Sequence, residues 1–323
     1  MATIREIAKL AKVSPSTVSR VLNHDSSINV TMETKRKIFK VAESLEYEKP
    51  NKQKNNSSNL NFGLMYKYNE EEEISDSFFL SIRLGIEEEC RLKNINLIHV
   101  NSKTIANNLN GIIFLGRFTT EEIEIHEKLC NNIVLIHNKS KNFNHDCLLI
   151  DFREITRDVI DYFISENHSK IAYIGGREKT IINNKTFKFD NDREDEFINY
   201  TKKLHIYNEN YIYVKDFSIE SGYQMTGELI KNAKDLPTAI FAGNDAIAIG
   251  ILRKLKENNL NIRVVGCNDT PTAKHFSPSI STVRIYTNFL GREAVGILEN
   301  KIKNPKERCL RYTIPHKLII RET

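Results

Sequence analysis

A short segment near the amino terminus, SPSTVSR at residues 14–20, carries side chains that can contact DNA. The guanidinium of Arg20 can make two hydrogen bonds to guanine O6 and N7, and the Ser16 hydroxyl can read several base edges. Pro15 offers only apolar contact, for instance with a thymine methyl group. Phosphate oxygens suit the remaining hydroxyls, those of Ser14, Thr17 and Ser19. Two simpler interpretations stay open: Ser14 is only a helix cap, and Arg20 is a solvated surface residue.

Three predicted helices position this segment. The first begins at Ile4, because Thr3 and Glu6 form a T-x-x-E capping box. The second begins at Pro15, after the capping Ser14, and ends near Leu22, while Thr31 caps the third. Apolar residues at helical spacing predict a small shared core. They are Ile4, Ile7, Ala8, Leu10 and Ala11, then Val13, Val18, Val21 and Leu22, then Ile38, Phe39, Val41, Ala42 and Leu45.

The charge of the chain is concentrated in this region. Residues 1–60 hold 11 lysines and arginines against 6 acidic residues, whereas the rest holds 36 against 36, so the whole formal net charge of +5 lies here. A basic surface on a helix-turn-helix is expected of a protein that neutralises backbone phosphates. The alternative is a small trihelical interaction domain without a nucleic-acid role.

The string TIREIAKLAKVSPSTVSRVLN resembles the headpiece of the LacI/GalR family of bacterial transcription regulators. Within that family the nearest pattern is the evolved β-galactosidase repressor branch, through LNHDSSINVTMETK, ISDSFFLSIRLGIEEEC and STVRIYTNFLG. The resemblance extends over essentially the full chain. It implies that base reading falls on Pro15, Ser16 and Arg20. The DNA contacts expected in addition are Thr3, Ser14, Thr17, Ser19, Asn23, Lys49, Lys52 and Lys54.

Residues 48–61, EKPNKQKNNSSNLN, form a polar hinge or linker. In the family this stretch usually carries a short hinge helix, PN-x-x-AR-x-L, whose leucine wedges into the minor groove. Pro50-Asn51 is present here, but the alanine, arginine and leucine are not, and Leu60 is the only nearby apolar candidate. We therefore expect less DNA bending and greater reliance on the linker lysines.

From residue 62 onward, short apolar runs alternate with amphipathic helices, which predicts parallel strands with helices on both faces. The predicted strands are Phe62–Tyr66, Ile95–Val100, Gly111–Leu115, Ile133–Ile136, Lys170–Gly175, Tyr211–Lys215, Ala239–Ala242 and Val264–Cys267. The expected fold is an all-α helix-turn-helix headpiece (1–47) followed, after the linker, by a two-lobed α/β domain of the periplasmic-binding-protein-like type I (62–323). Lobe 1 is expected to comprise about 62–151 and 285–313, and lobe 2 about 152–284 and 314–323. The predicted crossings between lobes lie near Asp151, Arg284 and Ile314.

An effector is expected in the cleft between the lobes, at the carboxyl ends of the strands. Sugars require planar hydrogen-bonding side chains and an aromatic plane. The resemblance places these roles on Phe78, Phe79, His137, Arg193, Phe217, Asn244 and Asn268. His137 and Asn268 stand where galactoside-binding relatives often have aspartate, so the pocket loses negative charge. Simpler interpretations are core packing for one of the two phenylalanines, helix capping at Asn244-Asp245, and a solvated face for Arg193 within DNDREDE.

Several classes of protein are not supported. Five scattered cysteines without paired spacing predict reduced thiols rather than disulfides or a metal site. No signal peptide or membrane-spanning stretch is recognisable, so a soluble, cytoplasmic protein is expected. No nucleophile elbow, P-loop or metal motif indicates an enzyme, and no cofactor is expected. A sugar transport receptor shares the fold but would need an export signal and no headpiece.

These features predict an effector-gated regulator, in particular a repressor of galactoside-type sugar utilisation. A homodimer is expected to bind a palindromic double-stranded operator with half-sites roughly 10 base pairs apart. The alternative effectors are another sugar, a sugar phosphate or a nucleoside. Induction and corepression both remain open.

Overall fold

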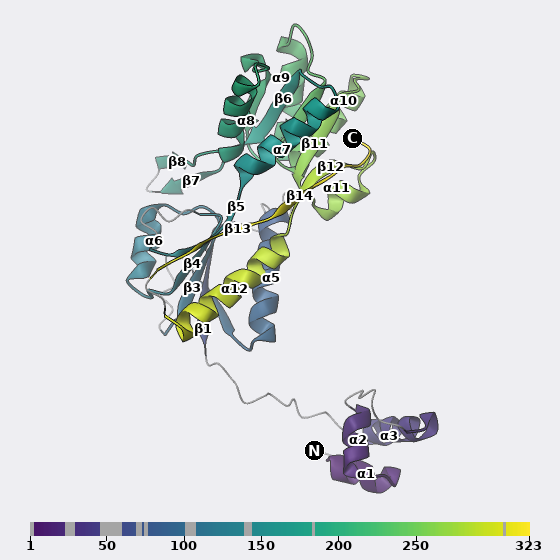
Figure 1. The fold of residues 1–323 in the computed structure, drawn as a ribbon. Helices are drawn as coiled ribbons and strands as arrows, with labels where there is room; N and C mark the ends of the chain where they lie inside the picture. The colour runs from purple at the N-terminus through teal and green to yellow at the C-terminus, as the bar shows by residue number, and fades with distance from the viewer. Residues whose placement is uncertain are drawn as a thin grey trace. The chain divides into compact units, whose positions relative to one another are not determined.

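The computed structural model describes residues 3–22, 30–45, 60–68, 73, 77–100, 108–138, 144–182, 185–305 and 308–323. The chain divides into two compact units, residues 1–57 and 58–323. The described part of the first unit is helical, and the second unit contains sheets with helices on both faces (Figure 1). The predicted fold class is confirmed.

The first unit contains α1 (Ile4–Ala11), α2 (Pro15–Leu22) and α3 (Met32–Ser44). The Thr3 capping box is present: Thr3 N donates to Glu6 Oε2 at 2.7 Å, and Glu6 N donates to Thr3 Oγ1 at 3.3 Å. The prediction for Leu10 is wrong, since it is 55% exposed. At about 100° per residue, Leu10 lies about 100° from the centre of the buried stripe. The buried residues are Ile7, Ala8, Ala11, Val18, Val21, Ile38 and Ala42.

Lobe 1 is built on a six-stranded parallel sheet in the order β13-β5-β4-β3-β1-β2. Its strands are β1 (Asn61–Tyr66), β2 (Asn96–Val100), β3 (Gly111–Leu115), β4 (Ile133–Ile136), β5 (Asp146–Ile150) and β13 (Arg311–Ile314). Alternate strand residues face opposite sides. Helices α5 (Ser77–Leu92) and α12 (Thr287–Lys303) cover one face, and α6 (Thr120–Glu127) covers the other.

Lobe 2 has a second six-stranded sheet in the order β14-β12-β11-β10-β6-β9. Its strands are β6 (Ile171–Gly176), β9 (Ile212–Lys215), β10 (Ala239–Ala242), β11 (Arg263–Asn268), β12 (Ser281–Ile285) and β14 (His316–Ile319). Helices α7 (Phe152–Ser165) and α8 (Asp192–Lys203) pack on one face, and α9 (Ile219–Asn232) and α10 (Asp245–Glu257) on the other. The edge strand β14 runs antiparallel to β12, which departs from the expected parallel arrangement.

Three further elements complete lobe 2. They are the hairpin β7 (Lys179–Ile182) with β8 (Lys185–Lys188), the 3-10 turn η1 (Glu209–Tyr211) and the short helix α11 (Pro271–His275). The segment after Gly175-Gly176 leads into the hairpin. The chain passes between the lobes at Asp151, Tyr286 and Pro315.

The start of β1 is held by asparagine side chains. Asn61 N donates to Asn110 Oδ1 at 2.8 Å, and Asn96 Nδ2 donates to Asn61 Oδ1 at 2.9 Å. Asn132 Nδ2 in turn donates to the Asn110 carbonyl at 2.9 Å. The neighbouring Leu60 is half-buried against the core of the domain. Leu60 is therefore engaged in packing against the core of lobe 1.

Other features concern only the described part of the chain. All five cysteines are free, four of them buried and Cys309 partly exposed. None of the described helices combines the length and apolar character needed to cross a membrane. The described residues contain no cluster of three or more His, Cys, Asp or Glu side chains placed to hold a metal ion.

Candidate functional site

Helix α2 presents the expected DNA-contacting side chains on its outer face. Pro15, Ser16 and Arg20 are exposed, whereas Val18 and Val21 on the opposite face are buried. The local sequence causes this division, because apolar residues three apart share one helix face.

The helix start confirms capping by Ser14. Its Oγ accepts a hydrogen bond from Thr17 N at 3.1 Å and lies 2.7 Å from Ser16 Oγ and 2.8 Å from Thr17 Oγ1. Thr17 and Ser19 are half-buried, and Thr3 is exposed. Capping does not use the full hydrogen-bonding capacity of these hydroxyls, so phosphate contacts remain a prediction. The predicted contacts outside the described residues are Asn23, Lys49, Lys52 and Lys54.

A small cavity of about 20 Å³, which we call the interlobe cavity, contains three of the expected effector residues. His137 follows β4 directly, Phe217 lies two residues after β9, and Arg193 is near the start of α8. Such positions at the carboxyl ends of strands are where open α/β sheets bind ligands. The main side chains of the lining are Arg117, His137, Phe152, Glu178, Arg193 and Phe217.

A series of ring contacts joins the two lobes at this cavity. The Phe79 and His137 ring centroids are 5.8 Å apart, and those of His137 and Phe152 are 5.5 Å apart. The Arg193 guanidinium carbon lies 3.7 Å from the Phe152 ring centroid and 5.2 Å from that of Phe217. These distances permit cation–π attraction. Four of the seven expected residues, Phe79, His137, Arg193 and Phe217, therefore come together.

Arg193 does not belong to a solvated face. It is only 9% exposed, and its buried Nε has no hydrogen-bond partner among the described residues. A buried donor without a partner costs about 1–3 kcal/mol. Such a group between aromatic planes is suited to a ligand that supplies an acceptor.

The structure adds a carboxylate that the sequence argument missed. Glu178 precedes the hairpin and is about one-fifth exposed; its Oε2 lies 3.4 Å from His137 Nε2 and 3.7 Å from Arg117 Nε. Its Oε1 accepts a hydrogen bond from the Tyr68 hydroxyl at 3.2 Å. Burial by itself raises the pKa of Glu178, but the attraction and hydrogen bond of His137, with the charges of Arg117 and Arg193, lower this pKa to about 2. The negative charge expected to be lost at His137 is thus supplied from lobe 2.

Two missed residues share a simple sequence signal. Arg117 and Glu178 each lie two residues after a strongly apolar strand, β3 and β6. Charged residues at such strand ends face the site in this type of sheet. Arg117 Nη2 also donates to the Asp190 carbonyl at 3.1 Å, which joins lobe 1 to lobe 2.

Four expected effector residues do not line the interlobe cavity, although Phe79 contacts the ring of His137 beside it. Phe78 is 5% exposed and belongs to the core. Asn244 is 1% exposed and caps α10, accepting a hydrogen bond from Ile247 N at 2.9 Å. Asp245, expected to be that cap, instead accepts from Thr282 Oγ1 at 2.6 Å. Asn268 is 6% exposed, and its Oδ1 has no hydrogen-bond partner in the described structure.

Unusual backbone angles occur at the ends of strands β3, β4 and β11. The φ values are 107° at Gly116, 60° at His137 and 116° at Asn268. Left-handed conformations are uncommon for residues other than glycine and concentrate at functional sites. At Gly116 a Cβ atom would lie 2.9 Å from Tyr68 Cε2, so glycine allows the tyrosine to lie across this strand end.

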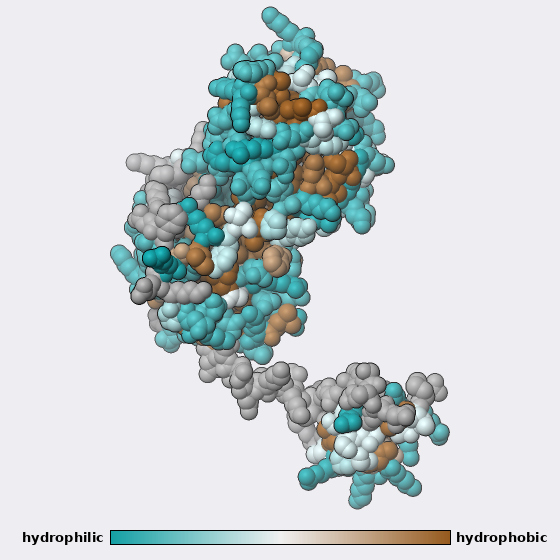
Figure 2. All heavy atoms as spheres, viewed as in Figure 1, coloured by the Kyte–Doolittle hydropathy of each residue, from teal (hydrophilic) through white to brown (hydrophobic). Residues whose placement is uncertain are grey.

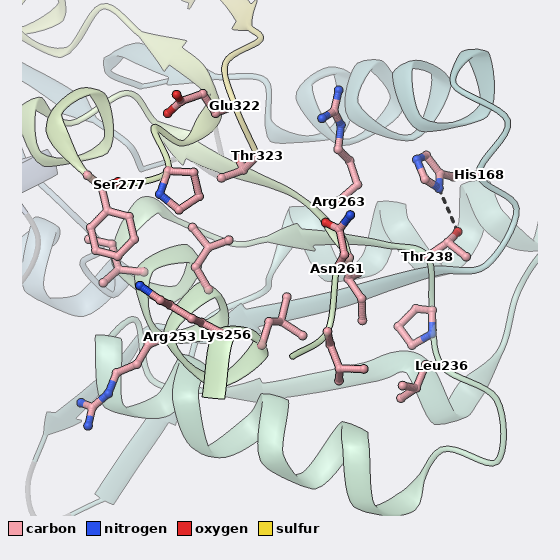
Figure 3. A pocket seen from close by; sticks show the side chains of 18 of the residues that line it. His168, Leu236, Thr238, Arg253, Lys256, Asn261, Arg263, Ser277, Glu322 and Thr323 are labelled. Carbon is pink, nitrogen blue, oxygen red and sulfur yellow. Dashed lines mark hydrogen bonds between the residues drawn. The ribbon is translucent and has the colours of Figure 1, made fainter. Parts of the chain in front are cut away.

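A larger hollow, of about 1340 Å³, lies elsewhere on lobe 2 (Figure 3). Thr238 and Arg263 line it at the starts of β10 and β11, and His168 Nδ1 lies 2.9 Å from Thr238 Oγ1. It is therefore at the amino ends of the strands, opposite to the end where such sheets bind ligands. None of the expected site residues lines it.

A helix-turn-helix unit joined to a two-lobed α/β domain with a cavity at the strand ends defines the class of ligand-responsive DNA-binding regulators. The model for bacterial regulatory proteins of the lacI family matches residues 3–51, and that for a periplasmic binding protein-like domain matches residues 160–323. The chain belongs to the LacI family. It is accordingly a transcriptional regulator and not an enzyme.

Individual relatives span almost the whole chain. The HTH-type transcriptional regulator GalR of Streptococcus thermophilus is 33% identical over 95% of both chains. The regulator GanR of Bacillus subtilis (strain 168) is 30% identical over 100% of this chain and 99% of its own. A lac repressor dimer bound to operator and the anti-inducer ONPF has the same fold, with a TM-score of 0.67 and 19% sequence identity. The match covers 99% of this chain and 98% of the lac repressor chain.

Proposed function

We propose that this regulator binds a palindromic operator through α2 and is controlled by a galactoside-type sugar in the interlobe cavity. The observation that carries the proposal is the buried guanidinium of Arg193 between the rings of Phe152 and Phe217. Sugar hydroxyls accept hydrogen bonds from such a group, and sugar C–H faces pack on aromatic rings. The relative named GalR supports a sugar of this type.

On the DNA side, Arg20 supplies most of the sequence discrimination, with Ser16 and Pro15 as weaker base contacts. The groups assigned to phosphates or flanking contacts are Thr3, Ser14, Thr17, Ser19, Asn23, Lys49, Lys52 and Lys54. Leu60 packs against the core of lobe 1, so we expect no apolar wedge to bend the operator centre, and specificity then depends on the major groove.

A homodimer fits this function, because one helix-turn-helix reads too few base pairs. Exposed apolar side chains on lobe 1 support it: Leu84 on α5 is 48% exposed and Phe289 on α12 is 49% exposed. Figure 2 shows apolar patches on an otherwise hydrophilic surface. We further propose that the protein acts in the cytoplasm, where it meets its operator DNA, and that it acts without a cofactor.

One gel-shift experiment tests both halves of the proposal, using full-length protein and a probe selected from a random DNA pool. Arg20→Ala is expected to lose roughly 1–3 kcal/mol on the selected probe and little on random DNA. The control Arg5→Ala removes an exposed arginine of α1 and should affect both probes alike. Equal losses for Arg20→Ala on both probes would refute base reading by Arg20.

Sugar is added in the same experiment. Galactose or lactose should change the affinity of the wild-type protein for the selected probe by about 5- to 150-fold, the range of typical allosteric coupling. If a purine nucleoside has this effect and neither sugar does, the galactoside assignment is wrong and the regulator assignment stands.

A further inference from the structure

Glu178 is held more loosely than comparable carboxylates of the domain. Among the described residues its side-chain contacts are with Tyr68, His137 and Arg117, at 3.2, 3.4 and 3.7 Å. The carboxylate of Glu73, by contrast, accepts two hydrogen bonds from Arg83 at 2.7 and 2.8 Å. Charge-assisted hydrogen bonds are normally about 2.7–2.9 Å long. Glu178 therefore retains capacity to accept hydrogen bonds from a ligand that approaches more closely.

Donors without partners accompany this carboxylate. Within the described residues, the Nε atoms of Arg117 and Arg193 are buried and have no hydrogen-bond partner, and both side chains line the interlobe cavity. The site thus offers a ligand one acceptor, the Glu178 carboxylate, and two donors, the Nε atoms of Arg117 and Arg193. A hydroxyl group satisfies both kinds, because it donates one hydrogen bond and accepts others.

The charges around the cavity discriminate between ligands. Three acidic residues line it, Glu178, Asp190 and Asp192, against two arginines, Arg117 and Arg193, and the Asp192 carboxylate is already paired with Arg153 at 2.9 Å. A phosphate monoester carries about −1.5 to −2 charges at pH 7, and its oxygens act mainly as acceptors. The phosphate group could satisfy the arginines, but Glu178 would repel it, and the group itself offers Glu178 no donor.

We propose that Glu178 is the residue by which the site selects uncharged, hydroxyl-bearing sugars and rejects phosphorylated ones. The proposal rests on the sugar-effector function proposed above and specifies its ligand class. The low pKa of Glu178 is consistent with it, since the carboxylate is fully ionised at neutral pH. The cavity of about 20 Å³ is far smaller than typical ligand pockets of roughly 300–1,000 Å³. Sugar entry must therefore move Glu178 away from Tyr68, His137 and Arg117 and replace those contacts with hydroxyls.

Calorimetric titration of the full-length protein with galactose, lactose and galactose 6-phosphate tests this selection. The wild type should bind at least one neutral sugar about tenfold or more tightly than the phosphate. Glu178→Gln keeps the shape of the side chain and removes its charge. This variant should bind neutral sugar about 10- to 100-fold more weakly, and its preference for neutral sugar over galactose 6-phosphate should be smaller than that of the wild type. The control Glu228→Gln alters an exposed carboxylate on α9, which pairs with Lys215 of β9. It should change neither the affinity for neutral sugar nor the preference over the phosphate.

The possible outcomes separate the two proposals. Unchanged affinity and preference in Glu178→Gln, or a wild type that prefers galactose 6-phosphate, overturns the role of Glu178 and leaves the sugar-effector function in place. A wild type that binds none of the sugars removes the sugar-effector function and this role together. If Glu178→Gln does not fold, Glu178→Asp, which keeps the charge, must still favour the neutral sugar, and loss of that preference would also overturn the proposal.

Discussion

Replacement of Arg193 by methionine should separate sugar binding from folding. Arg193 is 9% exposed, its guanidinium carbon lies 3.7 Å from the Phe152 ring centroid, and its Nε has no hydrogen-bond partner among the described residues. Methionine has a similar length, contacts aromatic rings favourably and carries no buried donor. Its introduction therefore removes a desolvated polar group without opening a large void.

The size of the effect on binding follows from the geometry of the guanidinium. A hydrogen bond to a charged group contributes about 1.5–3 kcal/mol, and the planar fork of an arginine makes two such bonds to one ligand. Losing both costs about 3–6 kcal/mol, which corresponds to roughly 10²- to 10⁴-fold weaker sugar binding. The melting temperature without sugar should stay the same or rise, because the unpartnered Nε is gone.

Calorimetric titration with galactose and thermal unfolding without ligand provide the two measurements. The matched control is Arg157→Met on α7, where the side chain is 52% exposed and pairs with Glu196 outside the cavity. The control should keep wild-type sugar affinity. If Arg193→Met binds galactose as the wild type does, or melts well below it, Arg193 has a structural role and the argument from its unpartnered donor is wrong.

Two further predictions concern helix packing and pH. Gly291→Ala should lower the free energy of unfolding by about 1–3 kcal/mol, because its Cβ would lie 2.1 Å from the Ile82 carbonyl oxygen and force α5 and α12 apart. In the control Gly296→Ala, on the same helix, the new Cβ would meet only Lys93 Nζ at 3.9 Å, so this variant should raise the free energy of unfolding by up to about 1 kcal/mol. Similar urea-unfolding midpoints for the two variants would contradict the packing argument. The pKa of Glu178 is depressed from 4.5 to about 2, so its contribution to stability is present above pH 4.5 and is lost as pH falls from there through 2. The difference in melting temperature between wild type and Glu178→Gln should therefore be constant from pH 5.5 to 4.5 and become smaller below pH 4.5. If the difference has already disappeared at pH 4.5, the low pKa of Glu178 is contradicted.

The sequence predicted strands best where burial is continuous. Runs such as Ile133–Ile136 and Ala239–Ala242 are fully buried and were located to the residue. Strand β12 was missed because its polar residues are satisfied by distant partners: Ser281 Oγ donates to the Thr323 carbonyl at 2.6 Å, and Thr282 Oγ1 donates to Asp245 Oδ1. Contacts about 40 residues apart are invisible to local periodicity. The hairpin β7–β8 was missed because its strands are short and rich in lysine.

The candidate site was predictable in part for similar reasons. Arg193 and Phe217 carry residue types suited to sugars, and the structure places both at one cavity. Asn244 has a suitable type as well, but its local role as the cap of α10 uses its Oδ1 oxygen. Glu178 was missed because its importance arises from Tyr68, Arg117 and His137 of lobe 1, which only the tertiary fold brings to it.

The asparagine contacts at the start of β1 bear on how salt will act on this regulator. Asn61, Asn96, Asn110 and Asn132 are uncharged, and their hydrogen bonds fix the point where the linker enters lobe 1. Added salt weakens phosphate contacts by reducing the gain from counterion release, but it has little effect on bonds between amides. The slope of DNA affinity against salt should thus count phosphate contacts of the headpiece and linker alone. Higher ionic strength can therefore weaken DNA binding while the hydrogen bonds that anchor the end of the linker to lobe 1 stay intact.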